Sequence, residues 1–451
     1  MKLSSINPFN QEVIKTFDTL NQDQLEQKVY KSETAFSAWK KSGYSERSNL
    51  LRRVSKNLRT NQENLAKIIT MEMGKPVTQS RAEVEKCAWV CEFYAENGQK
   101  FLEKERIDTD AKESWVEYQP LGPVLAIMPW NYPLWQVFRF AAPAVMAGNS
   151  CLLKHASNVS LCSLNIETIF NEAKAPKGLF QTLLIQSKQV EAVIKHQAIK
   201  AVTLTGSEPA GASVAAIAGK NIKKSVLELG GSNAFIVLAD ADLDIIMEDA
   251  VNGRFQNTGQ SCIAAKRFIL SEKIEKEFID RFTDRVKSLK VGNPLNEATE
   301  VGPMARVDLA EELEGQVKAS VKEGAHLLLG GNRDRAHFEP SILTRVEPGM
   351  PAFDQELFGP VAAFTTVSGP EEALQLTNNS RFGLGATVCT SDPEKARYFI
   401  EGVDDGAVFV NSMVKSDPRL PFGGTKYSGY GRELSSHGIK EFVNIKTVYM
   451  K

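Results

Sequence analysis

Cys262 has the surroundings that most suggest chemistry. It ends the segment FQNTGQSC, residues 255–262, which follows a stretch, residues 244–255, with a helical pattern of apolar residues. A lone cysteine is usually a small buried hydrophobic side chain, and that interpretation stays open. The preceding glycine and the amide and hydroxyl neighbours favour an accessible thiol instead. Such a thiol is a nucleophile when its pKa is lowered or a base lies near it.

A candidate base precedes this cysteine by 34 residues. Glu228 lies in LELGGS, residues 227–232, at the end of a predicted apolar strand. An ionisable carboxyl group between apolar residues and glycines is a poor choice for structure alone. Together, Glu228 and Cys262 therefore favour a general base and a nucleophile over two structural residues.

Four further motifs accompany this pair along the chain. They are PWNYP at residues 129–133, LTGS at 204–207, ELFGP at 356–360 and PFGG at 421–424. With these motifs in this order and at these spacings, the chain resembles the NAD(P)-dependent aldehyde dehydrogenases over nearly all of its 451 residues. Within the family it most resembles the shorter branch, which oxidises succinate semialdehyde to succinate.

The resemblance implies a covalent mechanism. Cys262 adds to the aldehyde carbonyl, and the oxyanion that forms is stabilised by Asn131 and by the backbone N–H of Cys262. Hydride transfer to the nicotinamide leaves a thioester, which water activated by Glu228 hydrolyses.

The segment 205–211 lies between a predicted strand and a predicted helix and carries glycines at both ends. Such turns let backbone amides approach a pyrophosphate, but the usual G-x-G-x-x-G spacing is absent, and the residues alone favour a plain helix capped by Ser207. The resemblance implies a dinucleotide here. It assigns the cofactor to Trp130, Lys154, Ser157, Gly206, Ser207, Gly211, Leu229, Glu356 and Phe358.

Ser157 bears on the choice of cofactor. Most members of the family that prefer NAD have a glutamate at this position, which accepts hydrogen bonds from the ribose 2′-hydroxyl and repels a 2′-phosphate. A serine removes the repulsion and can donate to a phosphate. We therefore expect NADP to be preferred, with NAD also usable.

The resemblance also suggests how a second carboxylate on the substrate is held. Arg139 matches the family's arginine for this group, and a planar guanidinium suits a carboxylate. Many relatives have a second arginine six residues before the nucleophile, where this chain has Gln256. Gln136, Ser416 and Arg419 are candidate substitutes.

Composition narrows the class of protein. The net charge of −1 and the lack of a long basic run give no indication of nucleic acid or an anionic membrane surface. No apolar run approaches the roughly 20 residues that span a bilayer. Six dispersed cysteines and five histidines show no disulfide framework or metal motif. We expect no metal and a cytoplasmic location.

Apolar residues at helical spacing predict a helix at 45–74. From about residue 124 strands alternate with helices, which include helices predicted at 135–147 and 190–195, and this alternation predicts a parallel sheet covered by helices. The resemblance implies an α/β fold with a Rossmann-type cofactor domain, an α/β catalytic domain and a small β unit for oligomerisation. We expect the cofactor domain at 1–112 and 124–228, the catalytic domain at 229–425, and oligomerisation strands at 113–123 and 426–451. The resemblance implies a homo-dimer or homo-tetramer assembled through these strands.

Two other functions of proteins with this resemblance fit the sequence less well. A CoA-acylating relative would lack the general base, and a non-catalytic dinucleotide-binding protein would be expected to lose Cys262 or Glu228; both residues are present. A broader-range aldehyde dehydrogenase that acts on other semialdehydes or aliphatic aldehydes stays open as the alternative.

Overall fold

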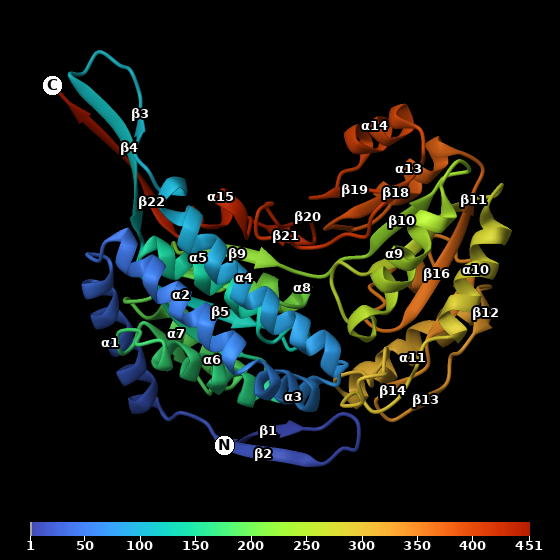
Figure 1. The fold of residues 1–451 in the computed structure, drawn as a ribbon, viewed down its shortest axis with the longest axis horizontal. Helices are drawn as coiled ribbons and strands as arrows, with labels where there is room; N and C mark the ends of the chain where they lie inside the picture. Colours follow the sequence, from blue (N-terminus) through green and yellow to red (C-terminus); the bar gives the residue numbers. More distant parts are fainter. Residues whose placement is uncertain (1) are drawn as a thin grey trace.

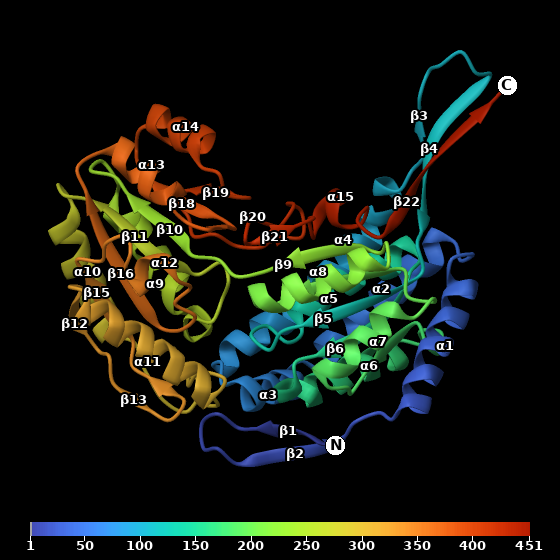
Figure 2. The same cartoon turned by 180° about the vertical axis from the view of Figure 1, so that it is seen from behind.

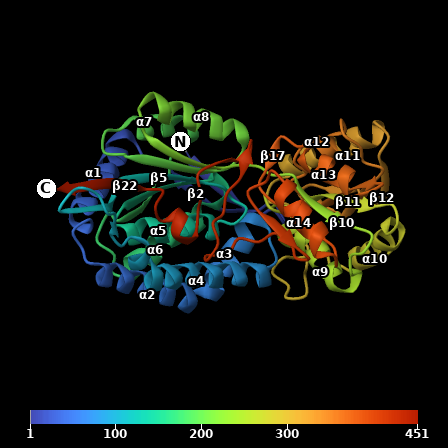
Figure 3. The same cartoon turned by 90° about the horizontal axis from the view of Figure 1, so that it is seen from above.

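The computed structural model describes residues 2–451. Two sheets, each covered by helices, lie side by side, and a narrow β arm projects from one of them (Figures 1 and 3). The chain's C-terminus lies at the tip of that arm (Figure 1).

The first sheet has six strands in the order β21-β9-β8-β5-β6-β7. All neighbouring strands are parallel except β21, which pairs antiparallel with β9 at one edge. The order reverses between β5 and β8, so a crevice is expected between the carboxyl ends of these two strands. The strands are β5 (Pro123–Met128), β6 (Ser150–His155), β7 (Phe180–Thr182), β8 (Ala201–Thr205), β9 (Lys224–Glu228) and β21 (Gly429–Tyr430).

Successive residues of β5 show why this sheet carries helices on both faces. Val124, Ala126 and Met128 pack in one core with the helices of one face, and Leu125 packs in another core on the opposite face. The first face is covered by α2 (Tyr44–Thr60), α3 (Gln62–Met73), α4 (Val77–Phe101), α5 (Trp135–Ala147) and α6 (Ser160–Glu172), and the second by α1 (Gln22–Trp39), α7 (Val190–Lys195) and α8 (Glu208–Lys220) (Figures 1 and 2).

The second sheet has seven strands in the order β12-β15-β16-β11-β10-β18-β19, and only β12 runs antiparallel to its neighbour. The strands are β10 (Asn233–Val237), β11 (Ala265–Ser271), β12 (His326–Leu329), β15 (Ser341–Thr344), β16 (Val361–Val367), β18 (Ala386–Cys389) and β19 (Val408–Val410). The accompanying helices are α9 (Leu243–Phe255), α10 (Glu275–Lys287), α11 (Val307–Lys322), α12 (Pro351–Asp354), α13 (Pro370–Asn378) and α14 (Pro393–Gly402).

The arm is a three-stranded antiparallel sheet. Its strands are β3 (Glu105–Arg106), β4 (Glu113–Pro120) and β22 (Val443–Met450), and β22 pairs with β4 along its whole length. The remaining elements are short: β1 (Lys2–Ile6), β2 (Val13–Asp18), β13 (Arg333–Asp334), β14 (His337–Phe338), β17 (Phe382–Gly383), β20 (Thr425–Lys426) and α15 (Ser435–Gly438).

The predicted α/β fold with parallel sheets is confirmed, and the predicted helices at 135–147 and 190–195 have the observed bounds. The single helix expected at 45–74 is wrong, because the chain divides into α2 and α3 at Asn61. There the backbone leaves helical geometry and the side-chain amide donates to the carbonyl of Asn57, 3.0 Å away. The domain boundaries stay a prediction. None of the helices within residues 2–451 is both long and apolar enough to cross a membrane.

Candidate active site

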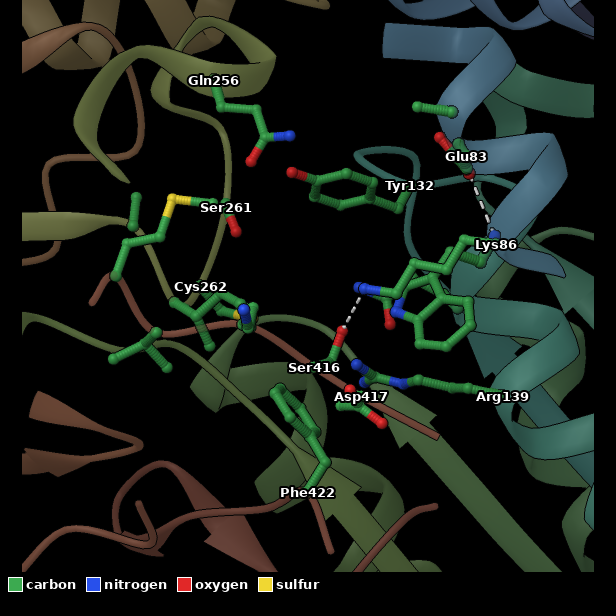
Figure 4. A pocket seen from close by; sticks show the side chains of 18 of the residues that line it. Glu83, Lys86, Tyr132, Arg139, Gln256, Ser261, Cys262, Ser416, Asp417 and Phe422 are labelled. Atoms are coloured by element: carbon green, nitrogen blue, oxygen red, sulfur yellow. Dashed lines mark hydrogen bonds between the residues drawn. The ribbon is translucent and has the colours of Figure 1, made fainter. Parts of the chain in front are cut away.

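Cys262 lies where two cavities meet. One, of about 450 Å³, is lined by residues of α4 and α5, of the segment 253–264 and of the segment 413–422, and is called the helical cavity below. The other, of about 390 Å³, is lined by residues that follow β5, β8 and β9 and is called the sheet-edge cavity. Cys262 belongs to the lining of both cavities and is half-buried. Figure 4 shows it in the lining of the helical cavity. A group bound in one cavity can therefore meet a group bound in the other at this thiol.

The loop before Cys262 has an unusual backbone. Asn257, Thr258 and Gly259 have φ values of 57°, 55° and 70°, all in the left-handed region. Only glycine fits at 259, because an added Cβ would lie 2.3 Å from the carbonyl oxygen of Gly359. The buried guanidinium of Arg254 holds this conformation by donating to the carbonyl oxygens of Gly259 and Gly359, at 2.7 and 2.8 Å.

Asn131 is buried beside this loop, in the turn between β5 and α5. Its side-chain amide donates to the carbonyl of Gln260 at 3.2 Å, and its own carbonyl accepts from the side chain of Asn257 at 2.9 Å. Asn131 lines the sheet-edge cavity together with Cys262. The turn and the nucleophile loop are thus bonded to each other, which brings the predicted oxyanion donor to the predicted nucleophile.

The turn that carries Asn131 is itself held by α4. Glu83 accepts hydrogen bonds from the backbone N–H groups of Leu134 and Trp135, at 2.8 and 3.0 Å. It thereby provides partners for N–H groups at the N-terminus of α5 that have none within the helix. Lys75 forms a buried ion pair with Glu83. These contacts hold the N-terminus of α5 in place beside the turn that carries Asn131.

Burial raises the pKa of the Cys262 thiol to about 11, while the positive charges of Arg139 and Lys266 oppose that rise. Lys266 is fully buried and donates to the carbonyls of Ser261 and Cys262, at 2.8 and 2.9 Å. Without a ligand the thiol therefore remains protonated near neutral pH, and its local cations are already in place to stabilise a thiolate.

Glu228 ends β9 and is only 1% exposed. Neither of its carboxyl oxygens has a hydrogen-bond partner within residues 2–451. Burial and the negative charge of Glu433 raise the pKa of Glu228 well above its usual value. Glu228 is not among the residues that line either cavity, so the predicted role as a base for the cysteine requires a side-chain rotation or a bridging water.

Arg139 extends from α5 into the wall of the helical cavity. Its guanidinium is already engaged: it forms an ion pair with buried Glu433, donates to the hydroxyl of Thr205 at 3.3 Å and lies 4.6 Å from the centre of the Phe422 ring. No sequence motif pointed to Glu433, which is 294 residues from Arg139. The arginine predicted to bind the substrate's carboxylate lines the helical cavity, but Glu433 is already its counter-ion there.

The other predicted substrate residues are distributed unequally. Gln136 and Ser416 line the helical cavity, as does Gln256. Arg419 is outside that lining: both ends of its guanidinium bind Asp417, at 2.8 and 2.6 Å, and its side chain is 67% exposed. Lys86, which sequence reasoning did not single out, lines the same cavity (Figure 4).

The sheet-edge cavity contains most of the residues predicted to bind the cofactor, and it lies at the crevice between β5 and β8. The helix α8 begins beside it without a side-chain cap on its first amides, a setting that suits a phosphate. Gly211 lets α8 approach closely, since an added Cβ would lie 2.6 Å from the Leu229 side chain. The predicted residues in the lining are Trp130, Gly206, Ser207, Leu229, Glu356 and Phe358.

Two aromatic rings and one carboxylate define the end of the sheet-edge cavity near the cysteine. Trp130 and Phe358 meet edge to face with ring centres 5.7 Å apart. Glu356 accepts from the backbone N–H of Gly231 and pairs with Lys266, both at 3.1 Å. A carboxylate beside a flat aromatic wall fits a nicotinamide riboside, with hydroxyls to bind and a ring to contact.

Lys154 and Ser157 lie at and just beyond the end of β6, outside the lining of the sheet-edge cavity. Ser157 is exposed and Lys154 is half-buried. Burial lowers the pKa of Lys154, and no carboxylate within residues 2–451 forms an ion pair with it. A cation and a hydroxyl without a competing carboxylate fit a phosphate group at this edge.

The comparisons with known proteins identify the family. The model of the aldehyde dehydrogenase family matches residues 1–448, and the chain belongs to this family. It is therefore an oxidoreductase that acts on an aldehyde. Its predicted family is confirmed.

Particular relatives are similar over their whole lengths. The chain is 48% identical to a probable succinate-semialdehyde dehydrogenase [NADP(+)] of Synechocystis sp., covering 100% of both chains. It is 46% identical to the succinate semialdehyde dehydrogenase [NAD(P)+] Sad of Escherichia coli, covering 99% of this chain and 97% of the relative. A crystal structure of succinic semialdehyde dehydrogenase from Streptococcus pyogenes, in complex with NADP+, has a TM-score of 0.97 at 37% identity, with 99% of both chains covered.

Proposed function

We propose that this protein oxidises succinate semialdehyde to succinate with NADP, and more slowly with NAD. The observation that carries the proposal is the position of Cys262 at the junction of a dinucleotide-type crevice and a second cavity with cationic groups in its wall. The names of the similar full-length relatives support the same substrate and cofactor.

The helical cavity suits a short semialdehyde with a distal carboxylate. Its wall combines apolar surface from Trp135 and Phe422 with polar groups from Gln136, Arg139 and Ser416. We assign the carboxylate of the substrate to the polar side of this wall and its aldehyde carbon to the Cys262 end.

In the covalent step, the Cys262 sulfur forms a bond to the aldehyde carbon and its thiol proton is lost to solvent or to a nearby base. The carbonyl oxygen becomes an oxyanion, which the Asn131 side-chain amide and the Cys262 backbone N–H are placed to bind. Fixed donors of this kind typically contribute about 10²–10³-fold in rate. The bonds from Asn131 to Gln260 and from Asn257 to Asn131 hold this amide before substrate arrives.

A nicotinamide cofactor, when bound, supplies the hydride acceptor. Trp130 and Phe358 would line the pocket for its ring, and Glu356 would bind its ribose hydroxyls. Ser157 and Lys154 favour the 2′-phosphate of NADP.

The second half of the reaction hydrolyses the thioester on Cys262. Glu228 takes a proton from water, whose oxygen attacks the thioester carbon and releases succinate and the thiol. The raised pKa of Glu228 makes it a stronger base once it is ionised.

Assembly and location complete the proposal. The antiparallel pair β4 and β22 projects from the body with an exposed edge, and Ile445, Tyr449 and Met450 are exposed on it. Such an edge is suited to pairing with a second copy of the chain. We propose a homo-dimer or homo-tetramer that works in the cytoplasm.

The test is a comparison of kcat/KM for succinate semialdehyde, glutarate semialdehyde and butanal, each with NADP and with NAD, followed at 340 nm. The proposal expects the highest value for succinate semialdehyde with NADP. Comparable values for butanal would instead identify a broader-range aldehyde dehydrogenase.

A further inference from the structure

The charged residues of the helical cavity have protein partners with two exceptions. Its carboxylate Glu83 binds Lys75, and its carboxylate Asp417 binds Arg419. Its guanidinium, Arg139, pairs with Glu433. The exceptions are Lys86 and Lys415, for which no ion pair is found within residues 2–451.

These two lysines differ in how firmly they are placed. Lys415 is exposed, and no hydrogen bond within residues 2–451 holds its ammonium group. Lys86 is half-buried, and its Nζ donates to Ser416 Oγ at 2.8 Å and lies 4.3 Å from the centre of the Trp135 ring (Figure 4). These contacts leave the ammonium group with N–H donors free and hold it in the cavity that leads to Cys262.

A partly buried ammonium group without a counter-ion is energetically unfavourable, and a bound anion would relieve the cost. We propose that Lys86 is the specificity-determining cation of this enzyme, which binds the distal carboxylate of the semialdehyde while Ser416 and Trp135 hold it in position. The inference rests on the proposed function. A cation at Lys86 would bind the carboxylate although Gln256 stands where many relatives have an arginine. It would also allow Arg139 to remain paired with Glu433.

The titration of Lys86 gives the proposal a specific signature. Burial, and secondly the positive charge of Arg139, lower the pKa of Lys86 to about 8, while the thiol of Cys87 and the carboxylates of Asp417 and Glu83 oppose the shift. The ammonium group therefore loses its charge as pH rises through about 8. Capture of a carboxylate should weaken over this range, whereas an uncharged aldehyde should show no such loss.

The experiment compares Lys86→Met, Lys86→Arg and Lys415→Met with wild type, using succinate semialdehyde and butanal, which shares the four-carbon chain but lacks the carboxylate. Lys86→Met should lower kcat/KM for succinate semialdehyde by about 10- to 100-fold, mainly through KM, because it removes a charged hydrogen bond. Its kcat/KM for butanal should fall far less. Lys86→Arg should restore much of the preference, and Lys415→Met should change the ratio of the two substrates by less than about threefold, because exposed charges contribute little.

The pH profile supplies a readout that a purely structural role would not move. In wild type, the ratio of kcat/KM for succinate semialdehyde to that for butanal should fall as pH rises through about 8, and in Lys86→Met this fall should be absent. Equal losses on both substrates in Lys86→Met, or an equal effect of Lys415→Met, would overturn the role of Lys86 while leaving the proposed function intact. A wild-type enzyme that does not prefer succinate semialdehyde would overturn both.

Discussion

The side-chain amide of Asn257 donates to the backbone carbonyl of Asn131 at 2.9 Å, and thereby joins the loop that precedes the proposed nucleophile to the turn that carries the proposed oxyanion donor. The same amide donates to the carbonyl of Gln260, also at 2.9 Å. Asn257 adopts a left-handed backbone conformation that asparagine tolerates better than most residues. One residue thus supports both the shape of the loop and the distance between the two catalytic groups.

Asn257→Gly keeps the backbone freedom and removes both hydrogen bonds, whereas Asn257→Ala removes the bonds and adds backbone strain. Both variants should lose about 10- to 100-fold in kcat, because small displacements of catalytic groups are costly. Asn257→Ala should be less stable than Asn257→Gly by about 1 kcal/mol in urea unfolding. Equal stability of the two variants, with full activity, would show that this loop does not depend on Asn257.

The pH dependence of deacylation should report Glu228. Its pKa is raised, so the carboxyl group stays protonated to a higher pH than usual, and only the ionised form accepts a proton from water. The rate of thioester hydrolysis should therefore rise with pH through this pKa and then level off. Glu228→Gln should lack this rise and show a burst of reduced cofactor followed by a slow steady state, measured by stopped-flow absorbance at 340 nm. Loss of the burst itself would place Glu228 in activation of the thiol instead.

Ser157→Glu should move cofactor preference from NADP towards NAD. A carboxylate at this exposed position repels the 2′-phosphate and accepts from the free 2′-hydroxyl. The ratio of kcat/KM for NADP to that for NAD should fall by about 10- to 100-fold. Ser157→Ala, which adds no charge, is the matched control and should change the ratio less. An unchanged ratio in Ser157→Glu would mean that the phosphate is recognised elsewhere.

Oxidation should affect Cys262 before any other cysteine. The remaining five are fully buried, and the residue two positions after the nucleophile is Ala264, so no neighbouring thiol can close a short disulfide. Because burial raises the pKa of Cys262 to about 11, reaction of the ligand-free enzyme with a thiol reagent should accelerate as pH rises towards that value. Peptide mapping after peroxide treatment should find oxidised Cys262 that thiol reductants restore at early times. A disulfide between Cys262 and another cysteine of the chain would contradict this account.

Candidate site residues could be named from the sequence where a short motif surrounds them. Cys262, Glu228 and Asn131 each lie in a short motif, and the alternation of apolar strands and helices was sufficient to predict parallel sheets. The residues it did not reveal act through distant partners. Lys86 is an ordinary polar residue on a helix until Ser416, 330 positions later, accepts its hydrogen bond.

Contacts between residues far apart in the sequence account for other features that were not predicted. Arg139 was predicted to hold the distal carboxylate of the substrate, and Glu433 forms an ion pair with it from a segment that follows the last predicted motif. The N-terminal hairpin of β1 and β2 was not predicted, because its strands are short and largely exposed and pair through a turn at residues 7–11 rather than through a continuous apolar pattern. Such features depend on contacts that local sequence patterns do not encode.

We propose that the acyl group of the substrate stays bound to Cys262 as a thioester until Glu228 activates water to hydrolyse it. Glu228→Gln should be mixed with succinate semialdehyde and NADP, quenched in acid, digested and examined by mass spectrometry. We predict one succinyl group on the peptide that contains Cys262, in an amount that matches the burst of reduced cofactor, and none in a Cys262→Ala, Glu228→Gln control. Reduced cofactor formed without an acyl group on Cys262, or an acyl group on another residue, would contradict the mechanism.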